Sequence, residues 1–205
     1  MVTTIYLVRH GETDYNAQYR IQGHSNSKLN TKGIKQAEAR ARHLKNAKFD
    51  AAYSSDLIRA KKTAEIIATE HDLTVLSTKL IRERTFGHLE GRQWSEVMVE
   101  MKELFDHYHS LSTSDRFKYK PFESYDSDEE LVARLITLLR EVALTHANQT
   151  VLMVSHGGLM RAFLVHLGYA SDDNYDKINV KNTGYIQFQS DGVEFDVLDL
   201  VDIEC

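Results

Sequence analysis

The chain has 205 residues, which is enough for one substantial domain and short for two. Hydrophobic residues make up 42% and charged residues 27%, as in an ordinary globular protein, and no apolar run approaches the roughly 20 residues that cross a membrane. The formal net charge of -5 argues against a nucleic-acid or membrane-surface binder, because both surfaces are anionic. We therefore expect neither partner, while a locally basic pocket for a small anion stays possible.

The N-terminal stretch and the cysteine content bear on the cellular compartment of the protein. The opening stretch MVTTIYLVRHG has no basic segment before its apolar run and no small-residue cleavage site, so it does not predict a signal peptide. Cys205 is the one cysteine, which excludes an intramolecular disulfide and a cysteine cluster for a metal. A cytoplasmic protein is the simplest expectation.

Strands and helices alternate along the first part of the chain. The apolar run 3–8 predicts a strand buried on both faces, and 29–46 predicts a helix from its small and apolar residues three and four apart. A short strand over 49–55, a helix over 56–71 and a strand over 73–78 follow. This order is typical of a parallel sheet covered by helices.

The second part continues the alternation after an irregular stretch. A helix is expected over about 94–109, and the stretch 106–127 has no clear period. A strong helix over 128–147 precedes a buried strand over 150–154 and a helix over 157–168.

The end of the chain completes the fold class. Residues 185–200 predict a β-hairpin around a Ser-Asp-Gly turn. We expect an α/β fold: a three-layer α/β/α sandwich with a mostly parallel central sheet and a C-terminal hairpin. One domain is expected over 1–205, with about 94–127 as an inserted helical and irregular cap.

Basic and acidic side chains follow the predicted strands. Arg9 and His10 end the first strand, and His156 follows the strand over 150–154. Arg59 lies in the first turn of the helix after the second strand, and Glu83 follows the third. Because the carboxyl ends of parallel strands lie at one edge of a sheet, we expect these residues to converge there.

Such a group of cations is suited to a phosphoryl group. Arginine forks match phosphate oxygens, and the helix N-termini after 55 and 155 add positive potential. Gly11, Gly157 and Gly158 allow backbone N–H groups to approach a ligand closely. A neutral imidazole, whose ordinary pKa is roughly 6.5, can also attack phosphorus if its other nitrogen is held by a hydrogen bond.

Four motifs then carry a resemblance to a known family. RHGET, SSDLIRAKKTA, ERTFGHLEG and VSHGG occur in the order and approximate spacing of the histidine phosphatase superfamily, the phosphoglycerate mutase-like proteins, and the match covers roughly 3–168. The resemblance implies that His10 is the nucleophile that becomes phosphorylated. It implies that Arg9, Arg59 and His156 bind the phosphoryl group and that Glu83 donates a proton.

The resemblance reaches further residues with less regularity. Asn16 looks like another phosphate contact, and Gln22-Gly23 resembles a segment that lines the substrate side. Asn16 as a simple turn cap is the alternative. The chain departs from the family pattern at Asn26 and Lys28, where the family often has an aspartate and then a proline, and at Phe122, where it usually has a glycine. Family members of this kind use no metal ion, so no metal or other cofactor is expected.

We therefore expect a metal-independent phosphatase that hydrolyses phosphate monoesters of small metabolites through a phosphohistidine on His10 and releases inorganic phosphate. A phosphoglycerate mutase is the nearest alternative, but those chains tend to carry ERHYGxLQG where this one has ERTFGHLEG, and to have a longer insert. A non-catalytic phosphate-binding regulator is the alternative from another class. Neither the substrate nor the oligomeric state follows from the sequence.

Two other patterns have weaker interpretations. Asp106, His107 and His109 look like metal ligands, but an exposed helix end is the favoured interpretation. The aromatic and basic segment 105–125 either packs or contacts substrate. Candidates for a second anionic subsite are Arg84, Arg116, Lys118 and Lys120.

Overall fold

A six-stranded sheet forms the centre of the computed structural model, which describes residues 2–171 and 174–205. The strand order is β3-β2-β4-β1-β5-β6. The strands are β1 (Thr3–Arg9), β2 (Ala51–Ser55), β3 (Val75–Thr78), β4 (Thr150–Ser155), β5 (Asn179–Ser190) and β6 (Phe195–Glu204). The first four are parallel, and the two C-terminal strands pair antiparallel.

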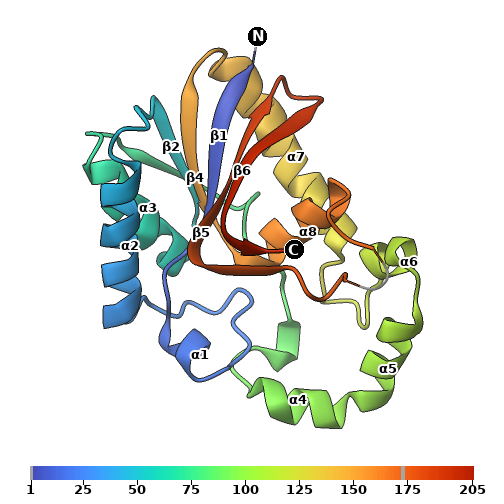
Figure 1. The fold of residues 1–205 in the computed structure, drawn as a ribbon. Coiled ribbons are helices and arrows are strands. Elements are labelled where there is room, and N and C mark those ends of the chain that lie inside the picture. Colours follow the sequence, from blue (N-terminus) through green and yellow to red (C-terminus); the bar gives the residue numbers. More distant parts are fainter. Residues whose placement is uncertain (1, 172–173) are drawn as a thin grey trace.

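Helices cover both faces of this sheet (Figure 1). One layer contains α2 (Thr31–Leu44) and α3 (Ile58–Thr69), which contact each other, and the other contains α7 (Asp128–Thr145) and α8 (Gly157–His166). The expected three-layer α/β/α sandwich with a mostly parallel sheet and a C-terminal hairpin is confirmed.

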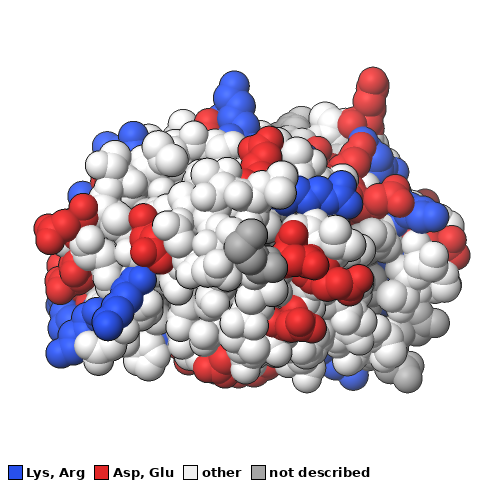
Figure 2. All heavy atoms as spheres, turned by 90° about the horizontal axis from the view of Figure 1, so that it is seen from above, with Lys and Arg blue, Asp and Glu red and all other residues white. Residues whose placement is uncertain are grey.

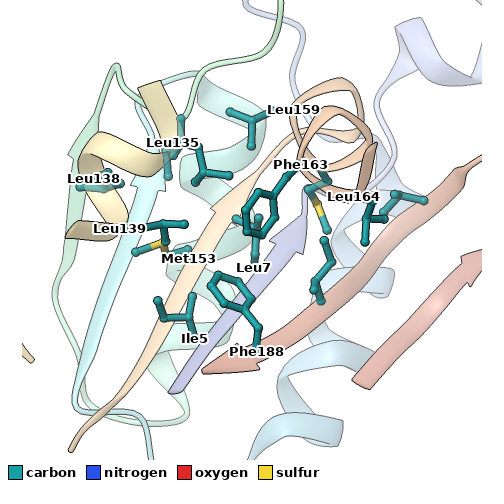
Figure 3. Close-up of a cluster of buried hydrophobic side chains, with 14 of the residues drawn as sticks. Ile5, Leu7, Leu135, Leu138, Leu139, Met153, Leu159, Phe163, Leu164 and Phe188 are labelled. Atoms are coloured by element: carbon teal, nitrogen blue, oxygen red, sulfur yellow. The ribbon is translucent and has the colours of Figure 1, made fainter. Parts of the chain in front are cut away.

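The larger core lies between the sheet and α7 and α8 (Figure 3). Ile5 and Leu7 of β1 and Met153 of β4 point into it and meet Leu135 of α7 and Phe163 of α8. A second buried cluster lies on the other face, where β1, β2 and β4 pack against α2 and α3. Both faces of the central strands β1 and β4 are therefore covered, as their unbroken apolar runs predict, whereas the edge strand β3 is partly exposed.

The segment expected as one helix over 94–109 is instead two helices with a break at Met101. The helices are α4 (Trp94–Glu100) and α5 (Lys102–Ser110), and Met101 has φ -104° and ψ 25°. The irregular stretch also contains a short helix, α6 (Thr113–Lys118), whose N-cap Ser112 accepts a hydrogen bond from the N–H of Asp115. In Figure 1, these helices curve away beyond the end of the sheet at which β1 and β4 finish.

Charges on the surface are mixed in sign. Figure 2 views the molecule from the end at which β1 begins, and acidic and basic side chains are interspersed on that face. Among the described residues, no helix is both long and apolar enough to span a membrane.

A close approach of two backbone segments fixes the turn that follows β1. An added Cβ at Gly11 would lie 2.5 Å from the carbonyl oxygen of Gly33, and one at Gly33 would lie 2.0 Å from the carbonyl oxygen of Glu12. Gly33 lies in the first turn of α2, where its N–H donates to the side chain of Asn30. The absence of a side chain at both glycines therefore holds the chain directly after Arg9 and His10 against the start of α2.

Gly33→Ala is expected to lower the free energy of unfolding by about 1–3 kcal/mol, because the new methyl group would overlap backbone atoms. The sign of this change tests the close approach, because a glycine-to-alanine substitution inside a helix ordinarily raises the free energy of unfolding by roughly 0.5–1 kcal/mol. Chemical denaturation of both proteins measures the difference. Lys35→Ala, at an exposed position of the same helix, serves as the control and should leave stability nearly unchanged. A stabilised Gly33→Ala variant would contradict the close approach.

Candidate active site

His10 has a defined tautomer at the end of β1. Its Nδ1 lies 2.7 Å from the carbonyl oxygen of Gly11, which only accepts hydrogen bonds, so Nδ1 carries the proton. Its Nε2 accepts from Nε of Arg59 at 3.3 Å, in agreement with a lone pair on that nitrogen. The backbone N–H of His10 donates to the carbonyl of Ser155 at 3.0 Å, which extends the pairing of β1 with β4. The nitrogen that bears the lone pair of the imidazole therefore faces a cation.

Arg59 is fully buried and is fixed by backbone carbonyls. Its two terminal nitrogens donate to the carbonyls of Gly23 at 2.7 Å and Ser25 at 2.8 Å. Gly23 has φ +50°, and an added Cβ would overlap the carboxylate of Glu90. The guanidinium thus holds the loop around 22–25 near His10, and burial lowers the pKa of Arg59 to about 10.

Arg9 and His156 complete the cationic group. Arg9 donates from a terminal nitrogen to the carbonyl of Val180 at 2.5 Å, while its buried Nε has no hydrogen-bond partner in the part of the chain that the structure describes. His156 is fully buried, its ring centre lies 5.2 Å from that of His10, and neither of its ring nitrogens has a partner among the described residues. Unpartnered buried donors at this depth are uncommon and are suited to a ligand that brings acceptors.

Burial and like charges keep the two histidines neutral. Desolvation, and then the positive charges of Arg59 and Arg9, hold the pKa of His10 well below its ordinary value. Desolvation followed by the charge of Arg59 does the same to the pKa of His156. Burial also lowers the pKa of Arg9, which the charge of Glu83 partly offsets. The pocket contains two arginines and two uncharged imidazoles.

Glu83 reaches the same place from the loop after β3. Its Oε2 accepts from the N–H of Gly158 at 3.0 Å, at the start of α8, and its Oε1 accepts from the N–H of Arg84 at 2.9 Å. A Cβ at Gly158 would lie 2.4 Å from Oε1, so only glycine leaves room for this carboxylate. A Cβ at Gly157 would lie 3.1 Å from Nε of Arg9.

Two cavities of about 300 Å³ each adjoin these residues, and both have Arg9, Glu83, Phe86 and Trp94 in their walls. The first continues over Arg84, Tyr125, Gly157, Gly158, Arg161, Ile178, Asn179 and Val180. The second continues over Tyr15, Asn16, Tyr19, Arg20, Ile21, Gln22 and Gly23. His10, Arg59 and His156 lie below this surface and are almost fully buried. All the residues expected at the site are thus brought to one region.

Asn16 and Gln22 both accept hydrogen bonds from Thr13, the residue directly before a short helix. Asn16 forms the capping box of α1 (Asp14–Ala17), in which its Oδ1 accepts from the N–H of Thr13 at 3.2 Å. Oε1 of Gln22 accepts from Thr13 at 2.9 Å and from Ser27 at 2.6 Å. The structure thus contains the turn cap that was the alternative for Asn16, and it also places Asn16 on a cavity wall.

Sequence reasoning missed several residues that support the site. Asn182 of β5 donates to the carbonyl of His10 at 3.0 Å, because the antiparallel strand begins where β1 ends. His24 bonds the carbonyl of Glu83 at 2.8 Å, and Glu90 accepts from the N–H of His24 at 2.9 Å. Asn26, one of the departures from the family pattern, accepts from the N–H of Ile58 in the first turn of α3 at 3.4 Å. The sequence carried a signal for His24 alone among these residues, because His24 directly follows Gln22-Gly23.

Asp106, His107 and His109, which resemble metal ligands in the sequence, contact other side chains in the structure. Asp106 pairs with Lys102, and Nε2 of His109 lies 3.5 Å from Asp176. His107 packs edge-on against Tyr119. Within the described part of the chain, no group of three or more His, Cys, Asp or Glu residues is arranged to hold a metal ion.

The aromatic and basic segment 105–125 lines a third cavity, of about 270 Å³. This cavity is mostly apolar, with Val97, Met98, Met101, Phe105 and Phe122 in its wall. It shares Phe86, Trp94, Tyr125 and Arg161 with the first cavity beside Glu83. The segment thus both packs and borders the site.

Comparison with known proteins places this geometry in a family. The family model described as the histidine phosphatase superfamily (branch 1) matches residues 5–203, so the chain belongs to that superfamily. The metal-independent phosphoserine phosphatase of Arabidopsis thaliana is 41% identical over 172 residues, which are 83% of this chain and 71% of that protein. Phosphoglycerate mutase-like protein 4 of the same organism is 36% identical over 77% of this chain and 68% of its own length.

A solved structure gives the same assignment. Phosphoserine phosphatase from Entamoeba histolytica, in complex with 3-phosphoglyceric acid, is 28% identical with a TM-score of 0.79 over 97% of this chain and 96% of that one. Together with the family match, these relatives assign the chain as a phosphoric monoester hydrolase.

The two neutral histidines predict how stability depends on pH. Because their pKa values are lowered in the folded state, the unfolded chain takes up their protons first as the pH falls below roughly 6.5. The free energy of unfolding should therefore decrease as the pH is lowered from about 7 to about 5. His156→Asn should reduce the slope of this pH dependence by up to about 1.4 kcal/mol per pH unit.

Chemical denaturation in a phosphate-free buffer at several pH values measures both slopes. His166→Asn, at an exposed position of the same helix, is the control and should keep the wild-type slope. Equal slopes for wild type and His156→Asn would show that His156 is not held neutral.

Proposed function

We propose that the protein is a metal-independent phosphatase that hydrolyses phosphate monoesters of small metabolites through a phosphohistidine on His10. Glu83 acts first as proton donor and then as general base, and Arg9, Arg59 and His156 bind the phosphoryl group. The tautomer of His10 carries the proposal, because its Nε2 lone pair lies inside a buried pocket of cations. Asn16, Gln22, Gly23 and Gly157 contribute further contacts to the substrate.

In the first step, Nε2 of His10 attacks phosphorus, and a P–N bond forms as the P–O ester bond breaks. The electron pair stays on the departing oxygen, which takes the proton of the Glu83 carboxylic acid and leaves as an alcohol. The ring becomes positively charged, and its Nδ1–H donor to the carbonyl of Gly11 stabilises that charge. Arg9 and Arg59 neutralise the transferring oxygens, which is the main source of acceleration in phosphoryl transfer.

In the second step, water attacks the phosphohistidine. The carboxylate of Glu83 takes one proton of that water, the new P–O bond forms, and the P–N bond breaks with its electron pair returning to Nε2. Inorganic phosphate leaves, and both His10 and Glu83 regain their starting protonation. Each residue is thus used twice, and no metal ion takes part.

The relatives support small phosphorylated molecules as substrates. One is named a phosphoserine phosphatase, and the Entamoeba enzyme has been solved with phosphoserine and with 3-phosphoglyceric acid. We further infer that 1–205 forms one domain in which 94–127 is a cap over the active site, because Trp94 and Tyr125 border the cavity next to Glu83. The leaving group of the substrate then lies between the cap and the end of the sheet.

His10→Ala is expected to abolish the hydrolysis of p-nitrophenyl phosphate, with a loss of about 10³-fold or more, because the covalent route needs the imidazole. Rapid acid-free quenching of the wild type with a radiolabelled substrate should trap an acid-labile, base-stable label on His10. His166→Gln, at an exposed position, is the control and should keep both the label and the activity. Turnover by His10→Ala at the wild-type rate, or a label on another residue, would contradict the mechanism.

The mutase alternative is tested with the same protein. Incubation with 3-phosphoglycerate and a bisphosphoglycerate primer should release inorganic phosphate faster than it forms the 2-phospho isomer. Isomerisation that outruns phosphate release would assign phosphoryl transfer instead. Binding of phosphorylated ligands with no more turnover than His10→Ala would assign a non-catalytic regulator.

Glu83→Gln is expected to depend on the leaving group. An alkyl monoester such as glycerol 3-phosphate needs a proton on its departing oxygen, so its kcat/KM should fall by about 10²–10⁴-fold. p-Nitrophenyl phosphate, whose leaving group is a weak base, should lose much less in the phosphorylation step. Steady-state and burst kinetics on both esters measure the difference. Equal losses would remove Glu83 from the role of proton donor.

A further inference from the structure

Arg161 projects into the active-site cavity from the helix that binds Glu83. It lies on α8 one turn after Gly157 and Gly158, so the three residues share one face of that helix. The same cavity of about 300 Å³ has Arg9, Glu83 and Arg161 in its wall. A substrate whose phosphoryl group lies near Arg9 and Glu83 passes Arg161 where its leaving group occupies this cavity.

The guanidinium of Arg161 is weakly held. No hydrogen bond joins it to another of the described residues, and its Nε is buried without a partner. Its counter-ion is Asp176, whose Oδ1 lies 3.9 Å from a terminal nitrogen of Arg161. Asp176 is also 3.5 Å from both Arg116 and His109 and accepts from Tyr108 at 3.3 Å. One carboxylate is thus shared among several donors.

Of the four cations that the sequence offered for a second anionic subsite, Lys118 is an exposed side chain outside the walls of both cavities beside Glu83, and the other three are more fully paired than Arg161. Arg84 pairs with the buried Asp128 and donates to the hydroxyl of Tyr125 at 2.6 Å. Lys120 pairs with Glu130 at 2.8 Å on the surface. Arg116 donates to the carbonyls of Leu111 at 2.9 Å and His109 at 2.6 Å. None of these bonds has a counterpart at Arg161.

We propose that Arg161 binds a second anionic group on the leaving group of the substrate, a carboxylate or a second phosphoryl group. Asp176 holds the guanidinium when this subsite is empty and yields it to the substrate anion. The inference rests on the proposed phosphatase function and specifies its substrates: phosphate monoesters with a second negative charge. The free hydrogen-bond donors of a planar guanidinium match the two oxygens of such a group.

The test compares matched esters on the wild type and on Arg161→Gln. 3-Phosphoglycerate and glycerol 3-phosphate differ in a carboxylate against a hydroxymethyl group, and fructose 1,6-bisphosphate and fructose 6-phosphate differ in the second phosphoryl group. For whichever anion Arg161 binds, the variant should raise KM by about 10- to 100-fold, as expected when a charged hydrogen bond is lost. The KM of the uncharged partner and that of p-nitrophenyl phosphate should change little.

Two further variants separate binding from a structural role. Arg161→Lys keeps the charge and should recover part of the affinity for the anionic ester. Asp176→Asn removes the competing carboxylate and should lower the KM of that ester several-fold, the opposite of what damage to the fold would produce. Arg140→Gln makes the same charge change at an exposed position of α7 and should leave every KM unchanged.

The outcomes distinguish this inference from the proposed function. Suppose that hydrolysis of p-nitrophenyl phosphate depends on His10 but that Arg161→Gln changes the KM of both esters in each pair equally. The proposed phosphatase function is then supported, and the proposed anionic subsite is overturned. An equal loss for all esters in Arg161→Gln, including p-nitrophenyl phosphate, also overturns it, since the arginine would then only support the fold. If wild type and His10→Ala turn over p-nitrophenyl phosphate equally, the proposed function itself fails.

Discussion

The structure depends on positive charge that is buried at the carboxyl ends of β1 and β4. Burying a cation without compensation costs several kcal/mol. Here the fully buried Arg59 and the partly exposed Arg9 both lie close enough to His10 and His156 for their charges to disfavour protonation of the imidazoles. Two features of the structure stabilise these buried charges. Both histidines stay neutral, and the arginines donate to backbone carbonyls: Gly23 and Ser25 for Arg59, and Val180 for Arg9. The donors that remain, on Arg9 and His156, are the ones an anion would satisfy.

This constraint explains the course of the loops around the site. The carbonyls that hold Arg59 come from the segment 22–25, so that segment must lie against α3, and Glu90 ties it to the loop after Glu83 through the N–H groups of His24 and Phe86. Glu83 in turn accepts from the N–H of Gly158 at the start of α8. The loops that border the two cavities therefore also hold Arg59 and Glu83 in place, and their positions are coupled to one another.

The sequence predicted the layers and the convergence of the site because both follow from local patterns. Unbroken apolar runs indicate buried strands, and Arg9, Arg59, Glu83 and His156 each follow such a run or begin the next helix. Features that depend on distant partners were missed. Helix α6 is short and has no apolar period, and the single helix expected over 94–109 breaks at Met101. Asn182 reaches His10 because β5 begins six residues earlier than the predicted hairpin and runs antiparallel to β1. Arg161 falls inside a well-predicted helix, but its cavity is built by residues from five other segments: β1, the loop after β3, α4, the loop before α7 and the start of β5.

The two cationic regions of the site differ in how firmly they are held. Around the proposed phosphoryl site, Arg9 and Arg59 donate to backbone carbonyls that are themselves fixed by loops and strands, so the charges cannot follow a differently shaped ligand. Preorganised dipoles of this kind favour the transition state because they need no rearrangement during the reaction. At Arg161, the carboxylate of Asp176 is shared with Tyr108, Arg116 and His109, and it lies 3.9 Å from the guanidinium, which is therefore held less firmly. The firm region is suited to the phosphoryl group, which is the same in every ester, and the looser region to the leaving group, which differs from one ester to the next.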